Sequence, residues 1–438
     1  MPEITPGAVL TLRVEKAVAG GAMLARVEGQ VVLVSGAIPG EEVRVRVDRV
    51  VARTPHATVT EVLEPSPFRR EGTEDAACGG QVYAHIAYPH QTVLKSSVVQ
   101  DAWTRIARLP WPGEPAVVAS PEHGYRMRAR LHARAGRIGF LREGTHEVCG
   151  AEAGGQLLPA TIDWVRGVEA LAARESVEIA SVELTENVAG TERAAHLDVQ
   201  RPPSRAFLEA VATTGSVSWA LAAPAGPRNG RRPRGAERHG GPVNGEASLV
   251  DGVAPQAGVA PVMLRRHAQA FFQGNRYLLA PLVQQVTAAV AAGSVLDLYA
   301  GVGLFGLSAA ALGRGPVVCV EGDAVSGEDL LGNATPLGPG VQVVQAPVER
   351  YVGSPAARRF APETVIVDPP RTGMLPDTAR AVAQLARQRV VFVSCDPATF
   401  ARDAKLLHEG GFTPSSLTVF DLFPNTAHVE TVGIFDRR

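Results

Sequence analysis

Residues Val295–Gly303, with the sequence Val-Leu-Asp-Leu-Tyr-Ala-Gly-Val-Gly, decide the fold of the C-terminal part of this chain. A short apolar strand runs into a glycine-rich turn, and such a turn could receive a nucleoside-bearing cofactor. Glu321 ends the next apolar run, close to the roughly 20-residue spacing at which an acid reaches ribose hydroxyls. This spacing favours an adenosine-type cofactor without distinguishing a nicotinamide cofactor from a methyl donor. A purely structural acid at position 321 is the alternative.

Apolar strands alternate with helical segments around this turn. The expected strands are 294–299, 317–320, 341–345, 364–367 and 390–394, and the clearest expected helices are 276–292 and 377–387. This alternation predicts an α/β fold with a doubly wound, largely parallel, Rossmann-like sheet. In such a sheet the chemistry lies at the carboxyl ends of the strands.

An acidic turn, Asp368-Pro-Pro-Arg371, follows the apolar run Val365–Val367. We expect it at a strand tip, where the prolines stiffen the exit and hold the carboxylate in place. In amino-group methylases a similar turn usually continues with an aromatic ring that stacks on the base. Arg371 stands in that place here, which weakens an N-methylation interpretation.

Cys395 follows the apolar run Val390–Val393 and precedes Asp396-Pro397. A lone cysteine is more often an inert small hydrophobe than a nucleophile. A thiol at a strand tip beside a cofactor pocket is exposed, however, and nearby donors could favour its thiolate. We therefore interpret Cys395 as a candidate nucleophile, and Cys319, inside an apolar run, as an inert buried thiol.

Glu430 lies in the strand-like stretch Val429–Val432. A carboxylate folded against a cofactor pocket can have a raised pKa and serve as a general base. An exposed strand glutamate is the alternative at this position. His428 is a competing base, for which a packing or hydrogen-bonding role is the simpler interpretation.

Composition bounds the class of protein. The 438 residues favour two or three domains, and the net charge of −1, from 43 Lys plus Arg against 44 Asp plus Glu, gives no global signal for a polyanionic partner. Any nucleic-acid surface must therefore be local. No secretory signal and no uninterrupted apolar stretch of roughly 18 residues is present, so we expect a cytoplasmic protein without membrane contact. The four cysteines form no C-x-x-C pair, and free thiols fit them best.

The N-terminal segment, residues 1–66, alternates apolar and polar residues in short runs. The runs are 9–14, 25–27, 31–34 and 43–47, and glycine-containing pairs separate them. Apolar and polar residues that alternate every second position, in short runs separated by turn residues, predict a small OB-like β-barrel. This fold often binds oligonucleotides.

The central segment, residues 70–265, is less regular. We expect an α+β arrangement with a helix near 91–109 and strands near 129–134 and 138–142. Residues 224–245 are rich in Arg, Gly and Pro, which predicts a mobile loop or linker. Its arginines could touch phosphates, although a solvated surface loop is the simpler interpretation.

Taken in order, these motifs resemble the bacterial RNA 5-methyluridine methyltransferases that use S-adenosylmethionine. The matching motifs are Gly20-Gly21, Pro39–Glu41 and Glu61–Ser66, then Cys78–Gln81 and Gly139–Gly144, and finally Phe271–Asn275, Asp297–Tyr299, Asp368–Arg371, Ser394–Pro397 and His428–Thr431. The resemblance implies a TRAM-like RNA-binding barrel at 1–66, an RNA-recognition domain at 70–265 and a catalytic domain at 266–438.

The resemblance also implies roles for particular residues. S-adenosylmethionine would be contacted by Gln273, Tyr299, Glu321 and Asp368. Cys395 would add to carbon 6 of a uracil, which makes carbon 5 electron-rich enough to take the methyl group, and Glu430 would remove the proton from carbon 5. The uridine would belong to rRNA or tRNA and would have to be flipped out to reach the pocket. No obligate protein partner is expected.

Some positions depart from the family pattern. Many relatives bind an iron–sulfur cluster through central-domain cysteines, three of them near a Cys-Gly-Gly-Cys motif. Here Cys78 is followed by Gly-Gly-Gln81, so neither an iron–sulfur cluster nor another metal is expected. Ala300, Leu304 and Pro347 replace residues frequent in relatives near the cofactor, which could weaken its affinity.

Two other interpretations remain open. A decayed RNA-binding protein of the same architecture would keep the barrel and lose cofactor binding, with Leu304 and Pro347 as its support. An N-methylating enzyme with an unusual acidic turn would keep its activity after Cys395→Ser. Calorimetry with S-adenosylmethionine tests the first, and that substitution tests the second.

Overall fold

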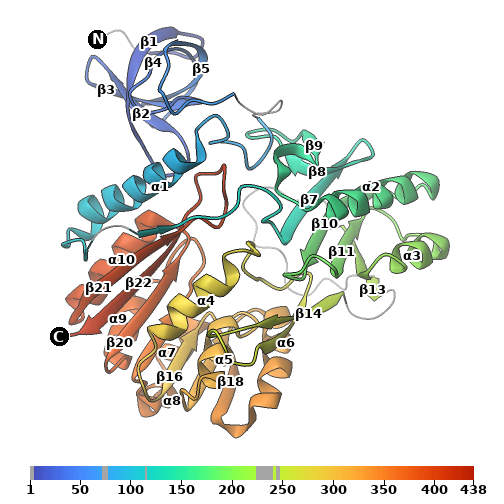
Figure 1. Ribbon diagram of the computed structural model, residues 1–438, viewed down its shortest axis with the longest axis vertical. Helices are drawn as coiled ribbons and strands as arrows, with labels where there is room; N and C mark the ends of the chain where they lie inside the picture. The colour runs from blue at the N-terminus through green and yellow to red at the C-terminus, as the bar shows by residue number, and fades with distance from the viewer. Residues whose placement is uncertain (1–3, 72–76, 114–115, 223–239, 243–246) are drawn as a thin grey trace. The chain divides into compact units, whose positions relative to one another are not determined.

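The computed structural model describes residues 4–71, 77–113, 116–222, 240–242 and 247–438 (Figure 1). The chain divides into two compact units. The first contains residues 1–122, 369–384 and 392–438, and the second contains residues 123–368 and 385–391. The division at residues 66, 70 and 265 into three domains stays a prediction. The Arg-rich segment 224–245 lies outside the described residues except for 240–242.

The first unit begins with a closed five-stranded barrel in the order β1-β2-β3-β5-β4. Its strands are β1 (Val9–Ala17), β2 (Met23–Val27), β3 (Gln30–Ser35), β4 (Glu42–Val51) and β5 (Thr54–Glu64). Buried residues alternate with exposed ones, as Val43, Val45 and Val47 of β4 show, and as the period of two predicts. The predicted barrel is confirmed, and β5 adds a strand beyond the four apolar runs.

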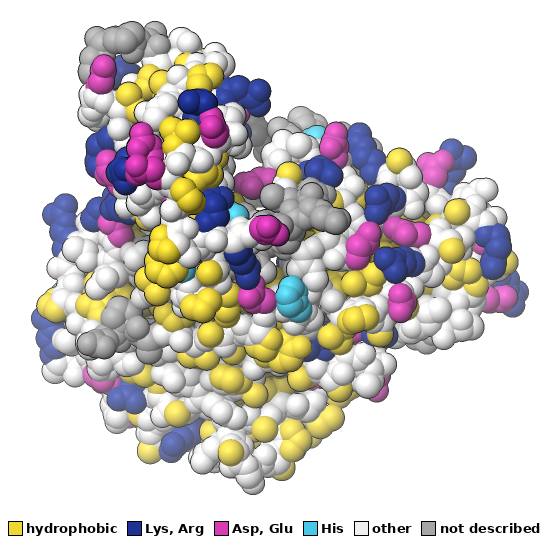
Figure 2. Space-filling model, turned by 45° about the horizontal axis from the view of Figure 1, so that its top comes forward, with side chains coloured by type: hydrophobic (Ala, Val, Ile, Leu, Met, Phe, Trp, Pro, Cys, Tyr) yellow, Lys and Arg dark blue, Asp and Glu magenta, His cyan; other side chains and the backbone are white. Residues whose placement is uncertain are grey.

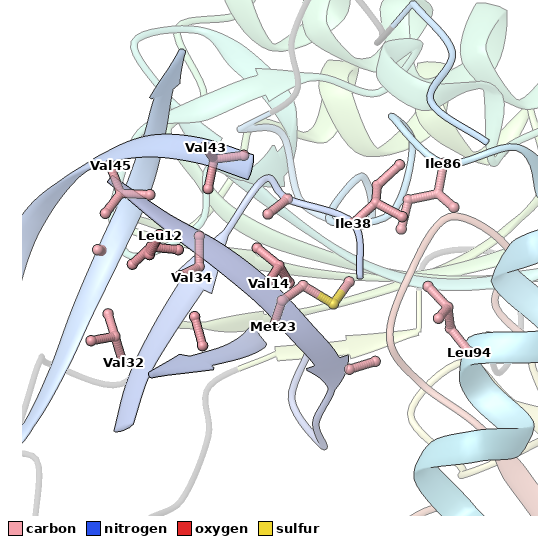
Figure 3. Packing of buried hydrophobic residues seen from close by; sticks show 14 of the residues in the cluster. Leu12, Val14, Met23, Val32, Val34, Ile38, Val43, Val45, Ile86 and Leu94 are labelled. Carbon is pink, nitrogen blue, oxygen red and sulfur yellow. The ribbon is translucent and has the colours of Figure 1, made fainter. Parts of the chain in front are cut away.

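The barrel core continues into the chain that follows it. Ile86 and Leu94 belong to the same buried cluster as Met23 and Ile38, and Figure 3 shows these side chains together. Ile86 and Ile38 are completely buried, and Leu94 is 5% exposed. The barrel is therefore fixed by apolar packing to the helix α1 (Tyr88–Ala102).

Helix α1 ends differently from its expected range of 91–109. It passes into one π-helical turn, η1 (Trp103–Ala107), and Arg108 then adopts a left-handed conformation with φ of 58°. A left-handed residue ends the helix, and Pro110 two positions later could not continue it. The helical segment therefore stops short of Leu109.

The rest of the first unit is built from C-terminal elements and one short strand. They are α9 (Pro376–Leu385), the end of β20 (Arg389–Ser394), α10 (Pro397–Glu409), β21 (Phe412–Phe420), β22 (Glu430–Arg437) and β6 (Ala116–Val118). Strand β21 pairs antiparallel with β22 and parallel with β6. These strands make the sheet mixed at this end, which the alternation of apolar runs did not reveal.

The second unit contains a seven-stranded sheet in the order β13-β12-β11-β10-β7-β8-β9. The strands are β7 (Arg128–Arg134), β8 (Arg137–Leu141), β9 (Val148–Gly150), β10 (Ile179–Glu186), β11 (Arg193–Val199), β12 (Ser216–Leu221) and β13 (Gly240–Pro242). The associated helices are η2 (Ala153–Gly155), α2 (Pro159–Arg174) and α3 (Arg205–Ala212). The strands expected near 129–134 and 138–142 are confirmed as β7 and β8.

A parallel run of strands, β18-β17-β16-β19, also belongs to the second unit. These are β16 (Val295–Leu298), β17 (Val317–Glu321), β18 (Val341–Gln345) and β19 (Thr364–Val367), while β14 (Ser248–Val253) and β15 (Val262–His267) form a separate pair. The helices are α4 (Leu279–Ala288), α5 (Leu304–Ala311), α6 (Ala324–Ala334), η3 (Thr335–Gly340), α7 (Val348–Val352) and α8 (Pro355–Phe360). The predicted Rossmann-like α/β class is confirmed.

Helix α4 is shorter than its expected range of 276–292. The Asn275 side chain accepts hydrogen bonds from the amides of Tyr277 and Leu278, so a turn precedes the helix. In the part of the chain that the structure describes, no helix is long and apolar enough to cross a bilayer.

Candidate active site

The residues expected to hold a cofactor surround one hollow in the second unit. It is lined by Phe271, Phe272, Gln273, Tyr299, Ala300, Gly301, Val302, Leu304, Phe305 and Asp368. Tyr299 follows the last residue of β16, and Asp368 follows the last residue of β19. The hollow therefore lies at the carboxyl ends of parallel strands, where ligands of such sheets bind.

The glycine-rich turn has a backbone that few residues could adopt. Tyr299, Gly301 and Gly303 have φ of 60°, 56° and 98°. A β-carbon on Gly303 would come within 2.4 Å of Leu307 Cδ1, so glycine is required there by space as well as by conformation. Tyr299 adopts a left-handed conformation without being glycine, and such strain is typical of ligand-binding turns.

Glu321 braces this turn from the end of β17. Its Oε2 accepts a hydrogen bond from Gly301 N–H at 2.7 Å, and its Oε1 accepts one from Asp323 N–H at 2.6 Å. Burial raises the pKa of the Glu321 carboxyl above its usual range. Glu321 does not line the hollow itself. It contacts the hollow through its hydrogen bond with Gly301, which is a lining residue.

Asp368 and Gln273 meet across the hollow. Gln273 Nε2 donates a hydrogen bond to Asp368 Oδ2 at 3.3 Å. Burial raises the pKa of Asp368 to about 7, although the hydrogen bond from Gln273 opposes the shift. A carboxyl with this pKa titrates near neutrality, and its ionised form would attract a cationic ligand.

Asp297 is a buried acid whose importance the sequence analysis missed. Its side chain is completely buried in β16, and Oδ2 accepts a hydrogen bond from Gly306 N–H at 2.7 Å. Burial raises its pKa to about 8, with further contributions from Asp368 and Glu321. The signal was available, because Asp297 interrupts an otherwise apolar strand. It ties β16 to helix α5 behind the glycine turn.

The positions that depart from the family pattern have distinct places. Ala300 and Leu304 line the hollow. Pro347 precedes α7 and lies against Gly322, where an added β-carbon would come within 3.4 Å of Pro347 Cα. Tyr299 extends past the turn, and its hydroxyl donates a hydrogen bond to Glu349 Oε1 at 3.1 Å in α7.

Cys395 lies in the first unit, between the last residue of β20 and Asp396, the residue before α10. Asp396 caps this helix, since its Oδ1 accepts hydrogen bonds from the amides of Ala398 at 3.0 Å and Thr399 at 2.9 Å. The N-terminus of a helix favours a nearby thiolate. Cys395 is partly exposed, whereas Cys319 is completely buried and burial raises its pKa well above the usual value.

Glu430 is the first residue of β22, where it pairs with Phe420 of β21. Its side chain is only 4% exposed, so the alternative of an exposed strand glutamate is wrong. His428 lies two residues earlier, and its Nδ1 accepts a hydrogen bond from Arg371 Nη2 at 2.6 Å. A histidine nitrogen that accepts from a guanidinium is a poor proton acceptor, which disfavours His428 as the base.

The loop between β21 and β22 is held by residues far away in the sequence. Lys95 of α1 forms a buried ion pair with Asp421, and its Nζ also donates to Phe423 O at 3.0 Å. Gln91 exchanges two hydrogen bonds with Asn425, each of 2.9 Å, through the side-chain amide and the Asn425 backbone N–H. No local pattern in the sequence indicates these contacts. Together they fix the segment that leads into Glu430.

Arg70 completes this arrangement. Its Nη2 donates to Asn425 Oδ1 at 2.7 Å, and Tyr83 N–H donates to Asn425 O at 2.8 Å. Asn425 itself is left-handed, with φ of 64°. The surrounding hydrogen bonds hold it in that conformation.

The cysteines correct one expectation. Cys319 and Cys395 are free, but Cys78 and Cys149 are disulfide-bonded, so the expectation of free thiols is wrong for these two. Within the described ranges, no group of three or more His, Cys, Asp and Glu side chains is arranged to hold a metal ion. The expected lack of an iron–sulfur cluster stays a prediction.

Comparisons with known proteins agree with this architecture. A family model described as tRNA (Uracil-5-)-methyltransferase matches residues 353–438, and a TRAM-domain model matches residues 4–60. Among solved structures, the Pyrococcus abyssi tRNA (uracil-54, C5)-methyltransferase in complex with S-adenosyl-L-homocysteine is similar with a TM-score of 0.74 and 22% identity, over 97% of this chain and 99% of that one. This likeness shows the fold.

Full-length relatives show the family. An uncharacterised RNA methyltransferase of Corynebacterium efficiens is 30% identical over 100% of this chain and 97% of its own length. The 23S rRNA (uracil(1939)-C(5))-methyltransferase RlmD of Burkholderia cenocepacia is 31% identical over 93% of this chain and 90% of its own length. Because the similarity runs through barrel, central segment and C-terminal part, the chain belongs to the S-adenosylmethionine-dependent RNA 5-methyluridine methyltransferase family.

Proposed function

We propose that this protein methylates carbon 5 of a uridine in ribosomal RNA through a covalent adduct with Cys395. The observation that carries the proposal is the position of Cys395, partly exposed between β20 and the capped N-terminus of α10. A thiol in this position is favoured as a thiolate, the form that attacks a pyrimidine.

S-adenosylmethionine fits the residues around the hollow. It carries an ammonium, a sulfonium and ribose hydroxyls, and it supplies an electrophilic methyl group when bound. The carboxyl of Asp368 and the amide of Gln273 suit the charged and polar groups of such a ligand. Tyr299 offers an aromatic surface, and Glu321 an acid beside the glycine turn that could reach the ribose.

The Cys395 thiolate forms a bond to carbon 6 of the uracil and moves the electron pair of the double bond towards carbon 5. Carbon 5 then takes the methyl group, forming a carbon–carbon bond while the donor leaves as a neutral thioether. The Glu430 carboxylate takes the proton from carbon 5. The electrons of that carbon–hydrogen bond restore the double bond and expel the thiolate.

Burial suits Glu430 for this step. Because Glu430 is only 4% exposed, few water molecules can hydrogen-bond to its carboxylate. The carboxylate is therefore available to accept the proton from carbon 5. The hydrogen bonds that anchor Phe423 and Asn425 restrict the segment before Glu430, so its backbone is held in one position.

Ribosomal RNA is the proposed substrate because the relatives that align over nearly the whole chain include several named as 23S rRNA methyltransferases. Those of Pseudomonas aeruginosa and Burkholderia cenocepacia are 29% and 31% identical over 99% and 93% of this chain. The barrel and the central segment would choose the target. We place the reaction in the cytoplasm, where the ribosome is assembled.

Trapping tests the mechanism. A ribosomal RNA transcript containing 5-fluorouridine, incubated with protein and S-adenosylmethionine, should give a denaturation-resistant conjugate, because fluorine at carbon 5 cannot leave as a proton does. Mass spectrometry should place the attachment at Cys395. Cys395→Ser should abolish both conjugate and methyl transfer, while Cys319→Ser should retain both.

Methyl transfer by Cys395→Ser at the native rate would contradict the adduct. Nucleoside mass spectrometry of RNA from cells lacking the gene separates the substrate classes. We expect a 5-methyluridine to disappear from ribosomal RNA, and its loss from transfer RNA alone would contradict the proposed substrate.

A further inference from the structure

The arginines on the outside of the barrel fall into two groups, those with an ion pair and those without one among the described residues. Three are neutralised by glutamates: Arg13 pairs with Glu42 and Glu64, Arg26 with Glu15, and Arg44 with Glu61. Because four glutamates face these three arginines, that part of the wall carries no excess positive charge. A polyanion would therefore gain little from approaching it.

The β4–β5 hairpin carries three arginines of the other kind. Arg46, Arg49 and Arg53 are exposed, and none has an ion pair with any residue that the structure describes. The acid in this stretch, Asp48, accepts a hydrogen bond from Thr58 Oγ1 at 2.7 Å. Three charges against one acid make this the locally basic part of a barrel whose other arginines are paired.

Apolar side chains accompany these charges. Val50 and Val51 are 39% and 50% exposed, and Val9, which pairs with Arg46 across β1 and β4, is 61% exposed. Val47 is the last residue of β4 that points into the core, because both faces of the strand are exposed beyond it. The β4 arm of the hairpin thus extends past the barrel core, and Val50 and Val51 are not part of the buried core cluster.

The tip of the hairpin is strained. Ala52 and Arg53, which connect Val51 to its partner Thr54, have φ of 47° and 69°. Two left-handed residues in a two-residue loop normally require Asn-Gly, and neither is present. Gln30 Nε2 donates to Arg53 O at 3.1 Å and supports the turn. Strain of this kind at an exposed tip is a reason to expect a function there.

On the face drawn in Figure 2, basic and acidic side chains are interspersed, and no large area carries one sign alone. With a net charge of −1, the chain cannot attract RNA by its overall field. Binding to a polyanion must then depend on small clusters of uncompensated cations. The hairpin surface, formed by Val9, Arg46, Arg49, Val50, Val51 and Arg53, is such a cluster.

We propose that the hairpin surface is where the barrel binds the RNA substrate. The three guanidinium groups contact phosphates, and the valines pack against an unstacked base or sugar of a single-stranded segment. This inference rests on the proposed function for the identity of the RNA. It adds which part of the barrel makes the contact and which part does not.

Salt dependence provides the test, with a mixed-sequence 30-nucleotide single-stranded RNA as the probe. In Arg46→Ala/Arg49→Ala/Arg53→Ala, the slope of log affinity against log salt should fall by about 2, since each lost phosphate contact on a single strand contributes about 0.7. The matched control, Arg13→Ala/Arg26→Ala/Arg44→Ala, removes as many arginines and should leave the slope nearly unchanged. All six are exposed, so thermal unfolding should confirm that both variants fold.

Two more variants sharpen the result. Arg46→Lys/Arg49→Lys/Arg53→Lys should keep the native slope because it keeps the charge. Val50→Ser/Val51→Ser should weaken binding without changing the slope. Equal slopes for the two alanine variants would overturn the proposal, as would binding of native strength in the serine variant.

Methyl transfer at saturating RNA keeps this test apart from the proposed function. The hairpin variants should keep the native maximal rate with a raised KM for RNA. An inactive native protein with the predicted slopes would contradict only the proposed function. Equal slopes in an active enzyme would contradict only the hairpin surface.

Discussion

The cofactor hollow and the loop that leads into Glu430 place their functional groups in opposite ways. In the hollow, Tyr299 and Asp368 follow directly after parallel strands, and the hydrogen bond from Gly301 to Glu321 spans 20 positions. The Glu430 loop is held instead by Lys95 and Gln91, whose contacts cross 326 and 334 positions. In the first region, the ends of neighbouring strands and the turns that follow them position the functional groups. The second depends on a distant helix.

This difference assigns different consequences to substitutions in the two regions. Substitutions in the hollow should change cofactor binding, because they alter buried titratable carboxyls such as that of Asp368. Changes at α1 act on the stability and position of a loop without touching a reactant. The two regions should therefore separate when binding, adduct formation and adduct release are measured independently.

Glu430→Gln should have the largest effect. A carboxamide cannot take the proton from carbon 5, so the methylated adduct with Cys395 should form and fail to resolve. Loss of a general base of this kind lowers turnover by about 10²- to 10⁴-fold. The measurement is a denaturing gel with ordinary uridine-containing RNA, on which the variant should show a stable conjugate that the native enzyme does not accumulate.

His428→Ala is the matched control for this prediction. It lies two residues away and should release its product within about tenfold of the native rate. If His428→Ala accumulates the conjugate and Glu430→Gln does not, the histidine is the base despite its hydrogen bond from Arg371.

Lys95→Met should have the next largest effect. It leaves Asp421 buried without its counter-charge, and breaking a buried ion pair costs about 3–5 kcal/mol. Asp421 Oδ2 has no hydrogen-bond partner among the described residues, and the neighbouring Tyr88 hydroxyl carries no positive charge that could replace Lys95. Urea unfolding measures the loss of stability, and trapping should show that adduct release slows more than adduct formation.

Lys405→Met provides the comparison, because Lys405 is exposed on α10. It should leave stability within about 0.5 kcal/mol of native. The variant Lys95→Met/Asp421→Leu should recover most of the lost stability, since it removes both charges. If it also restores release, the ion pair is dispensable, and the loop is positioned by the hydrogen bonds of Gln91, Arg70 and Tyr83 to Asn425.

The same contrast explains how much could be read from the sequence. The glycine turn, the acid after Val367 and the cysteine after Ser394 follow local rules of strands and turns, and the structure places them at strand ends as expected. Glu430 was a candidate base from its strand-like stretch, and the resemblance implied its role, but its burial could not be known. Lys95 and Gln91 gave no signal because a helical lysine is normally solvated, and its partner lies hundreds of residues away.

Strand β6 escaped prediction for a related reason. A strand of 3 residues is too short to show a period, and its partner β21 lies in the last part of the chain. Pairing of distant segments is fixed by the packing of the whole unit. Sequence patterns alone carry little information about it.

Asp368→Asn should have the smallest effect, and it tests the cofactor side of the comparison. Since burial raises the pKa of Asp368 to about 7, the carboxylate fraction grows about tenfold between pH 6 and pH 8. Calorimetry with S-adenosylmethionine should show native affinity rising on the order of tenfold over this range, because the ionised acid attracts the cationic ligand. Asp368→Asn should be about tenfold weaker at pH 8 and nearly independent of pH.

The sign can be checked independently through stability. A folded-state pKa above the unfolded value means that the folded chain holds a proton which the unfolded chain releases, so this group's contribution to stability is lost as pH rises from about 4 to 7. Asp368→Asn should remove that loss, whereas Asp377→Asn, at an exposed carboxyl, should not. If affinity is flat with pH while stability follows the predicted slope, Asp368 titrates without touching the ligand, and the hollow must hold its cofactor through Glu321 and the glycine turn instead.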